Sequence, residues 1–299
     1  MLRRSAIFMD TTVSIEVSYD ADETECLAAI DRAFGWFEHV ERACSRFDAE
    51  SELRKLTATA GSEVALSPLL FEALAFAVAL AEASDGAFDP TVGRMLEAAG
   101  FRRNYRTGVA TPSSPAPASA SYRDVVLNRE RHAVLLRRPA VLDLGGVAKG
   151  FAMDLAAGEL QAFARSVVYA GGDVVVRCHD ERAGEPFHIG VRDPRVRDSL
   201  LAVLSIQNGA VCTSGDYERV GAAGAHHLVD PRAGTSAGAV ASVTVVAPSA
   251  LLADGMATAA FVLGPEQGIE LLESADAEGL FVRPTLECVA TPGFLDYCR

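Results

Sequence analysis

Residues 141–150 read VLDLGGVAKG, an apolar run that passes through a pair of glycines into a helical pattern. Two consecutive glycines permit positive φ and close approach of the backbone to a ligand, and the exposed N–H groups of a helix that begins here attract anions. We expect Asp143 at the end of a strand and Lys149 in the first helical turn. The segment is neither a P-loop nor a GxGxxG dinucleotide fingerprint. A glycine turn before a helix is by itself more often a plain connection, so both interpretations stay open.

The chain before this stretch is predicted to begin with a strand at 6–19 and a mostly helical, amphipathic segment at 23–47. The pair Ser67-Pro68, a helix cap followed by a first-turn proline, predicts a second helix that extends to Asp85-Gly86. Residues 104–121 are rich in Pro, Ser, Ala and Thr, and we expect them to form an exposed, flexible loop.

From residue 122 onward, short β-type runs alternate with turns and with helical patches at 147–163 and 249–264, a pattern typical of the α+β class. A chain of 299 residues can bury a large core, as one large domain or as two closely packed lobes. We expect a single domain over 1–299. The runs expected to form strands are 124–128, 133–144, 166–169, 173–178, 187–192, 201–206 and 241–247.

The composition narrows the possible ligands. The formal charge is −13, which argues against nucleic acid, whose phosphates need a basic surface, and against an anionic membrane surface. An anionic cofactor would need a metal ion, a helix N-terminus or a few cations placed nearby. The sequence contains no run of 18 or more uncharged apolar residues, so it predicts no membrane span. The N-terminal apolar run is too short for a secretory signal. The six cysteines show no CxxC or zinc spacing, and we expect a cytoplasmic protein.

A second signal lies at Asp254 and Thr258, which are four residues apart in an apolar helical pattern and so share one helix face. A carboxylate and a hydroxyl are hard oxygen donors that suit Mg²⁺. In the alternative interpretation, the Thr258 hydroxyl bonds back to a helix carbonyl and Asp254 faces water. The sequence leaves the two interpretations nearly even.

A third signal is the pair His226-His227, which leads into a strand and a turn at Asp230-Pro231. A histidine can act as a base near neutral pH, but only one of two neighbours in a strand can face a given side. A lone histidine is usually structural or exposed, so spacing alone gives neither of them a role.

Taken together and in order, the motifs of this chain resemble those of the ApbE family of FAD:protein FMN transferases. The resemblance covers nearly the whole chain, and it is strongest in DLGGVAKG at 143–150, which is similar to the family's D-L-G-G-I-A-K-G. The sequence departs from the family at Asp10, Thr57 and Ala233, where relatives often carry Gly, Asn and Thr. The other matching segments are Met9-Asp-Thr, Ser45-Arg-Phe with Ser51-Glu-Leu, Ala87-Phe-Asp-Pro-Thr-Val-Gly93, Gly171-Gly-Asp, Thr213-Ser-Gly-Asp-Tyr217, His227-Leu-Val-Asp-Pro231 and Ala253-Asp254 with Thr258.

The resemblance implies an ApbE-type α+β fold with mixed or antiparallel sheets, packed helices and two closely associated lobes, in which FAD lies across a cleft. It implies that Mg²⁺ is held by Asp254, Thr258 and a backbone oxygen of the Gly146–Ala148 turn, and that His227 takes part in transfer. The residues implied to contact FAD are Met9, Phe47, Ala87, Phe88, Asp89, Asp143, Lys149 and Leu228.

The reaction that the resemblance implies is transfer of FMN from FAD to a threonine or serine hydroxyl of a target flavoprotein, with release of AMP. Hydrolysis of FAD to FMN and AMP on the same site is an alternative, and a non-catalytic FAD-binding or delivery protein is another. Many relatives are exported lipoproteins with a lipobox cysteine. Since this sequence shows no lipobox, we expect a cytoplasmic target.

Overall fold

The computed structural model describes residues 1–18, 22–103, 108, 110, 120–179, 184–218 and 226–299. Within these residues the largest sheet has eight strands in the order β1-β2-β6-β7-β10-β13-β14-β15, and its neighbouring strands pair antiparallel. The strands are β1 (Leu2–Phe8), β2 (Thr11–Val17), β6 (Arg165–Ala170), β7 (Asp173–Cys178), β10 (Gly209–Gly215), β13 (Ser242–Ala247), β14 (Glu278–Val282) and β15 (Cys288–Ala290).

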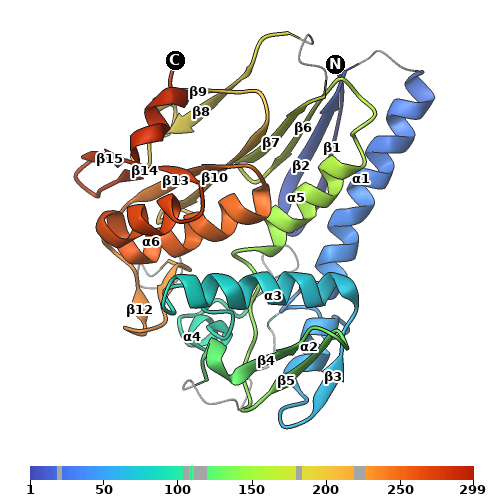
Figure 1. Cartoon of the computed structure of the whole chain (residues 1–299), viewed down its shortest axis with the longest axis vertical. Coiled ribbons are helices and arrows are strands. Elements are labelled where there is room, and N and C mark those ends of the chain that lie inside the picture. The colour runs from blue at the N-terminus through green and yellow to red at the C-terminus, as the bar shows by residue number, and fades with distance from the viewer. Residues whose placement is uncertain (19–21, 104–107, 109, 111–119, 180–183, 219–225) are drawn as a thin grey trace.

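Both faces of this sheet are covered, and the alternation of side chains along the strands shows how. Val168 and Val175 belong to the larger core, while their neighbours Val167 and Val176 belong to a second, smaller core, as expected when successive side chains point to opposite faces. The larger core lies under α1 (Glu23–Cys44), α5 (Ala148–Gly158) and α6 (Ala250–Glu273). The smaller core lies under the hairpin of β8 (Phe187–Arg192) and β9 (Leu200–Ile206) and the C-terminal 3₁₀ helix η3 (Pro292–Tyr297) (Figure 1).

A second lobe lies beyond α5 and α6, where α3 (Pro68–Ala83) crosses the molecule (Figure 1). It contains α2 (Glu52–Thr57), α4 (Gly93–Ala98), the 3₁₀ helix η1 (Tyr122–Asp124) and a small sheet in the order β3-β5-β4, with β3 (Glu63–Ala65), β5 (Ala133–Leu136) and β4 (Val125–Asn128). A short antiparallel pair of strands, β11 (Val229–Asp230) and β12 (Thr235–Ser236), lies near the end of α3 that is farther from this small sheet. The α+β class with antiparallel sheets, expected from the sequence, is confirmed.

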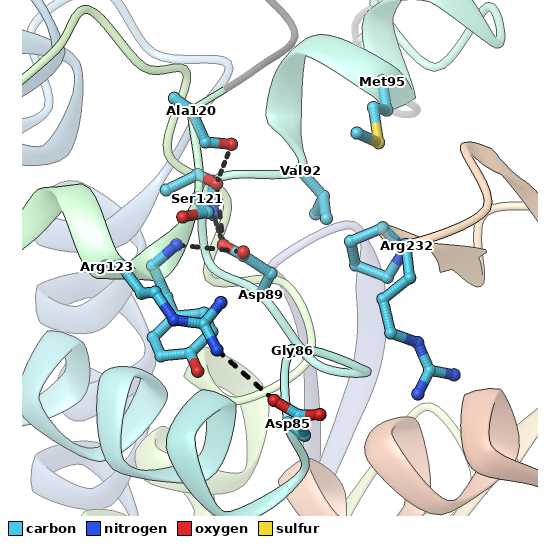
Figure 2. A pocket seen from close by; sticks show the side chains of 12 residues that line it. Asp85, Gly86, Asp89, Val92, Met95, Ala120, Ser121, Arg123 and Arg232 are labelled. Atoms are coloured by element: carbon cyan, nitrogen blue, oxygen red, sulfur yellow. Dashed lines mark hydrogen bonds and ion pairs between the residues drawn. The ribbon is translucent and has the colours of Figure 1, made fainter.

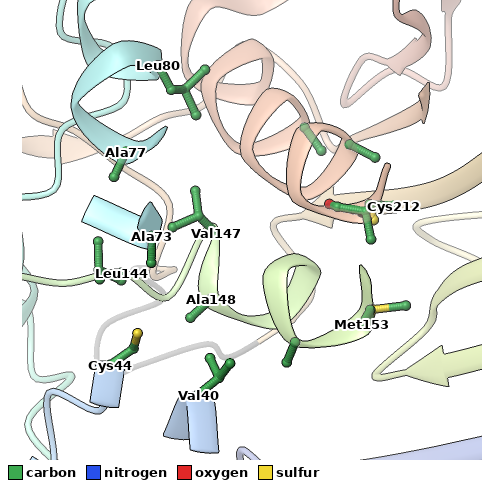
Figure 3. Packing of buried hydrophobic residues seen from close by; sticks show 14 of the residues in the cluster. Val40, Cys44, Ala73, Ala77, Leu80, Leu144, Val147, Ala148, Met153 and Cys212 are labelled. Carbon is green, nitrogen blue, oxygen red and sulfur yellow. Dashed lines mark hydrogen bonds between the residues drawn. The ribbon is translucent and has the colours of Figure 1, made fainter. Parts of the chain in front are cut away.

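The two lobes share the larger core. Side chains of α1, α3 and α5 meet there with Cys212 of β10 close by, as Figure 3 shows. The labelled members are Val40, Cys44, Ala73, Ala77, Leu80, Leu144, Val147, Ala148, Met153 and Cys212. Continuous apolar packing of this kind holds the elements that border the cavity described below in fixed relative positions.

Local sequence signals explain where the helices begin. Asp22 caps α1 by accepting the amide of Thr24, and Ser67 caps α3 by accepting the amide of Leu70, one residue before the first-turn proline. Ser249 caps α6 in the same way. No helix of the described residues is long and apolar enough to cross a bilayer.

Several predicted boundaries were wrong. The strand expected at 6–19 is the hairpin of β1 and β2, because Met9 and Asp10 both adopt positive φ, 48° and 61°, and turn the chain. The helix expected to end at Gly264 is interrupted there, where the glycine takes a φ of 77°, but Pro265 begins a second helical segment, which the prediction missed and which takes α6 to Glu273.

Other elements came out shorter than expected, or had not been expected. The predicted helix 23–47 ends at Cys44, the predicted helix 147–163 is α5, and the predicted strand 133–144 is limited to β5. Strands β10 and β14 had no counterpart in the prediction. The flexible loop predicted at 104–121 lies largely outside the described residues.

Candidate functional site

A cavity of about 570 Å³ lies between the two lobes and takes its lining from both. Every residue that the sequence analysis named as a site residue lines it. These residues are Met9, Phe47, Ala87, Phe88, Asp89, Asp143, Gly146, Ala148, Lys149, His227, Leu228, Asp254 and Thr258. The fold therefore brings together positions that lie up to 249 residues apart in the sequence.

The glycine turn faces the α6 helix across one wall of the cavity. A Cβ atom built on Gly146 would lie 3.0 Å from Thr258 Oγ1 and 3.1 Å from the ring of Phe88, so the turn and the helix are in close contact. The Thr258 hydroxyl donates to the Asp254 carbonyl at 3.1 Å. This is the bond to a helix carbonyl that the alternative interpretation of Thr258 predicted. A β-carbon at Gly146 would crowd the Thr258 hydroxyl and the Phe88 ring, and these neighbours would have to move by a few tenths of an ångström.

Asp254 is 7% exposed and does not face bulk water. Its Oδ2 accepts the Gly150 amide at 3.0 Å, and its Oδ1 lies 3.0 Å from the Lys149 ammonium. In a helix that began one residue earlier, the Gly150 amide would instead donate to the Gly146 carbonyl. Asp254 therefore joins α6 to the first turn of α5.

Lys149 also forms an ion pair with Asp173, whose other oxygen, Oδ1, accepts the Thr213 amide at 2.9 Å. The sequence analysis gave Asp173 no role beyond its place in a Gly-Gly-Asp turn. Gly171 and Gly172 have φ values of 60° and 98°, and this turn presents Asp173 at the first position of β7. A glycine pair before a single acidic residue was the signal that could have identified it.

Asp143 is held in the same way by a cation and an amide. Arg46 Nε donates to its Oδ2, and the Gly145 amide donates to its Oδ1 at 2.8 Å. Arg46 is buried, its guanidinium lies 4.3 Å over the ring of Phe47, and it also donates to the Phe101 carbonyl. The sequence analysis gave Arg46 no role, although it lies inside the matched Ser45-Arg-Phe47 segment.

The two adjacent histidines, neither of which lies within a strand, have different surroundings. His226 is buried, its Nε2 lies 2.7 Å from the Ala237 carbonyl, and its ring packs edge-on against Phe261. His227 lines the cavity, with its ring 6.3 Å from that of Phe101. His226 is therefore structural, and His227 is the histidine that lines the larger cavity.

A smaller cavity of about 260 Å³ adjoins the first and shares Asp89, Val92 and Pro231 with it. Figure 2 shows Asp89 at its centre, between Arg123 and Arg232. The Asp89 carboxylate accepts the Thr91 amide and hydroxyl through Oδ1 and the Tyr122 amide through Oδ2. Burial raises the pKa of this carboxyl above its ordinary value, although these hydrogen bonds act in the opposite direction.

Carboxylates outnumber cations in the described lining of the larger cavity. The acidic members are Asp10, Glu41, Asp89, Asp143, Asp173, Glu218 and Asp254, and the basic ones are Arg46, Arg103 and Lys149. An anionic ligand in such a cavity requires an additional positive charge near its phosphates. Among the described residues no cluster of three or more His, Cys, Asp or Glu could hold a metal ion.

These features define an α+β protein with a dinucleotide-sized, acidic cavity between two lobes, in which a glycine turn faces a helix that carries a carboxylate and a hydroxyl. The comparisons with known proteins identify the family. The ApbE family model matches residues 9–281, and this chain therefore belongs to the ApbE family.

The relatives agree with this assignment. The chain is 32% identical to the FAD:protein FMN transferase of Treponema pallidum, over 99% of the chain and 88% of that protein. It superposes on the ApbE protein of Thermotoga maritima with a TM-score of 0.88 and 31% identity, over 100% of this chain and 99% of that one. The flavin transferase ApbE of Vibrio cholerae gives a TM-score of 0.83 and 26% identity, over 99% and 98%. The resemblance drawn from the motifs is confirmed, and so is the expectation of an enzyme of the flavin transferase class.

Proposed function

We propose that this chain uses Mg²⁺ to transfer FMN from FAD to a threonine or serine hydroxyl of a target flavoprotein, with release of AMP. The single observation that carries the proposal is the contact between the glycine turn and α6, which brings Gly146, Asp254 and Thr258 to one wall of the larger cavity. The acidic lining supports a bound cation, since a diphosphate would otherwise meet mainly carboxylates.

The donors on that wall fit a hard divalent ion. Asp254 offers a carboxylate and Thr258 a hydroxyl. Of the two carbonyls considered, that of Gly146 is the better ligand. Ala148 is the first residue of α5, and its carbonyl belongs to the helical hydrogen-bond ladder, whereas the Gly150 amide that could have bonded to Gly146 donates to Asp254. When bound, the ion would neutralise charge on the diphosphate and on the departing AMP.

In the proposed reaction the acceptor oxygen attacks the FMN-side phosphorus of FAD, and the bond from that phosphorus to the bridging oxygen breaks. AMP leaves with the bridging oxygen, and the acceptor keeps FMN as a phosphoester. His227 is the proposed base that takes the hydroxyl proton, because it lines the cavity while His226 is held by the Ala237 carbonyl.

Contacts with FAD are proposed for the lining residues that the family motifs identify. Phe47, Ala87, Phe88 and Leu228 offer apolar surface for the flavin and adenine rings, and Met9 lies at the β1–β2 turn, where its amide donates to Glu41. Asp89, Asp143 and Lys149 are the proposed polar contacts. The acceptor is proposed to be a cytoplasmic flavoprotein; all six cysteines are free thiols in the structure, which is usual in a reducing compartment.

The direct test is to incubate the purified chain with FAD and Mg²⁺, with and without a flavoprotein that carries an acceptor threonine. We expect AMP release that depends on the acceptor, together with a fluorescent acceptor band under denaturing conditions. AMP release at the same rate without acceptor would establish the alternative, FAD hydrolysis. Binding of FAD with neither product would leave the delivery protein.

Asp254→Asn tests the metal site, since the amide oxygen can still accept the Gly150 amide while the charge is removed. We expect loss of Mg²⁺-dependent turnover by at least about a hundredfold, because the site loses its one proposed charged ligand. Full activity in this variant would rule out the proposed metal site.

His227→Ala tests the proposed base. We expect the transfer rate to fall by about a hundredfold or more, with little change in the Kd for FAD. His188→Ala is the matched control, because His188 is an exposed histidine on β8, outside the lining of the larger cavity. An equal loss of transfer and of FAD binding in His227→Ala would show that the histidine positions FAD instead.

A further inference from the structure

The Lys149 ammonium lies between two carboxylates, and each carboxylate also accepts a hydrogen bond from a backbone amide. Asp254 Oδ2 accepts the Gly150 amide and Asp173 Oδ1 accepts the Thr213 amide, while the remaining oxygen of each carboxylate contacts Lys149. Asp173 and Asp254 are 3% and 7% exposed. Two buried negative charges therefore share one positive charge, and neither carboxylate can turn away without giving up a backbone hydrogen bond.

This arrangement matters for Asp254. A cation that binds Asp254 has to compete with the ammonium, which already lies 3.0 Å from its Oδ1. The competition depends on where Lys149 goes when it leaves Asp254. Asp173 offers a second carboxylate on β7, already in contact with the ammonium, so Lys149 can give up Asp254 without losing its counter-charge.

We propose that Asp173 is a positioning residue that draws the Lys149 ammonium toward β7 and thereby leaves the Asp254 carboxylate free to bind a divalent cation. The inference rests on the metal site given under the proposed function. It assigns a role to a residue that neither binds the metal nor takes part in the transfer. Lys149 in turn acts as a movable counter-ion, which offsets one of the two negative charges before the cation arrives.

A purely structural role for Asp173 is the competing explanation. Its bond to the Thr213 amide ties β7 to β10, and its position after Gly171-Gly172 ends a tight turn. The variant Asp173→Asn keeps an oxygen acceptor for that amide and removes only the charge. An effect that arises through Lys149 should depend on the presence of the ammonium, whereas a structural effect should not.

The experiment is a double-mutant cycle of Asp173→Asn and Lys149→Met, read out by the shift in melting temperature as MgCl₂ is titrated into the metal-free chain without FAD. In the Lys149 background we expect Asp173→Asn to raise the midpoint Mg²⁺ concentration about tenfold, because the ammonium is then held by Asp254 alone. In the Lys149→Met background we expect Asp173→Asn to change the midpoint Mg²⁺ concentration only about twofold. This remaining change is the direct effect of the Asp173 charge on the ion. Lys149→Met alone should lower the midpoint, because no ammonium has to be displaced.

The same fold-change for Asp173→Asn in both backgrounds would overturn the inference and establish a structural or direct electrostatic role. A higher midpoint for Lys149→Met alone would overturn it as well, and this result does not require that the Asp173 variant fold. If the unmodified chain shows no Mg²⁺-dependent shift, the metal site itself is wrong and the inference falls with it. A shift that Asp254→Asn removes and Asp173→Asn leaves unchanged would overturn the inference alone.

Discussion

Asp89 shows how one residue can serve both the fold and the cavity. Its carboxylate accepts three hydrogen bonds that tie the turn after α3 to η1, and it lies where the two cavities meet. Burial raises its pKa from an ordinary value of 3.8. The folded protein thus takes up a proton on Asp89 at a higher pH than the unfolded chain does.

This difference predicts the sign of a pH dependence. Between the unfolded and folded pKa values of Asp89 the folded state binds more protons, so the contribution of this residue to stability falls as the pH rises through that window. We expect Asp89→Asn to remove this contribution, so that the slope of the free energy of unfolding against pH, above the ordinary pKa of 3.8, is more positive than in the unmodified chain. Urea denaturation at a series of pH values measures it. Asparagine also places an amide donor near the N–H and O–H groups that Asp89 accepts, which changes the free energy of unfolding by the same amount at every pH. The slope of that free energy against pH is therefore the decisive quantity. Parallel slopes would contradict the raised pKa.

At this scale the sequence named Asp143, Lys149 and Asp254 as site residues, and all three line the larger cavity. Arg46 and Asp173, which form ion pairs with Asp143 and Lys149, were not assigned any role, although both lie in matched segments. A matched segment does not show which of its side chains meets a distant residue. Only the folded chain shows that Arg46 and Asp143, 97 positions apart in the sequence, form an ion pair.

Among the elements, α5 and α6 approach each other most closely at Gly150. A Cβ atom built there would lie 2.2 Å from the Ala250 carbonyl oxygen and 2.9 Å from Asp254 Cβ, both of them on α6. The same glycine donates its amide to Asp254. At the N-terminus of α6, Asp154 of α5 accepts the amides of Ala250 and Leu251. The two helices are thus fixed to each other at the wall that carries the proposed metal ligands.

We therefore expect Gly150→Ala to destabilise the protein by about 2 kcal/mol or more, since the new methyl group meets backbone atoms that cannot rotate aside. Gly158→Ala is the control on the same helix: its Cβ would meet only the end of the Gln161 side chain, at 3.9 Å, and the higher helix propensity of alanine should make it neutral or stabilising by up to about 1 kcal/mol. Chemical denaturation of both variants measures the difference. Equal stabilities would show that α5 can move away from α6 at little cost.

The elements that the sequence failed to predict share a physical cause. Strand β10 reads GAVCTSG and ends in small polar residues, so it lacks the apolar alternation or the continuous apolar run by which strands are recognised. Its place in the sheet is decided by pairing with β7 and β13. The kink at Gly264 is a similar case, because a glycine before a proline is an equally good signal for the end of a helix and for a bend within one.

At the scale of the whole molecule, the sheet has separate cores on its two faces, and the larger of these also joins the two lobes. This sharing supports the single domain expected over 1–299, which stays a prediction. The charge is a second property of the whole chain. The chain carries a formal charge of −13, and the lining of its larger cavity is mainly acidic. FAD is also negative, because it carries two phosphates.

The last prediction follows from that charge. In buffer without divalent ions, FAD should be repelled during its approach, and monovalent salt should screen the repulsion, since the Debye length falls from about 30 Å at 0.01 M to about 8 Å at 0.15 M. We expect the association rate constant for FAD to rise about two- to fivefold over this range, as measured by stopped-flow flavin fluorescence. Riboflavin, which has the same ring system and no phosphate, is the control and should associate at a rate independent of salt.

An FAD rate that falls as salt is added would mean that the cations at the cavity, Arg46, Arg103 and Lys149, govern the approach in spite of the net charge. A rise for FAD alone would mean that the acidic chain opposes its own ligand until a divalent cation is present, as the proposed role of Mg²⁺ requires.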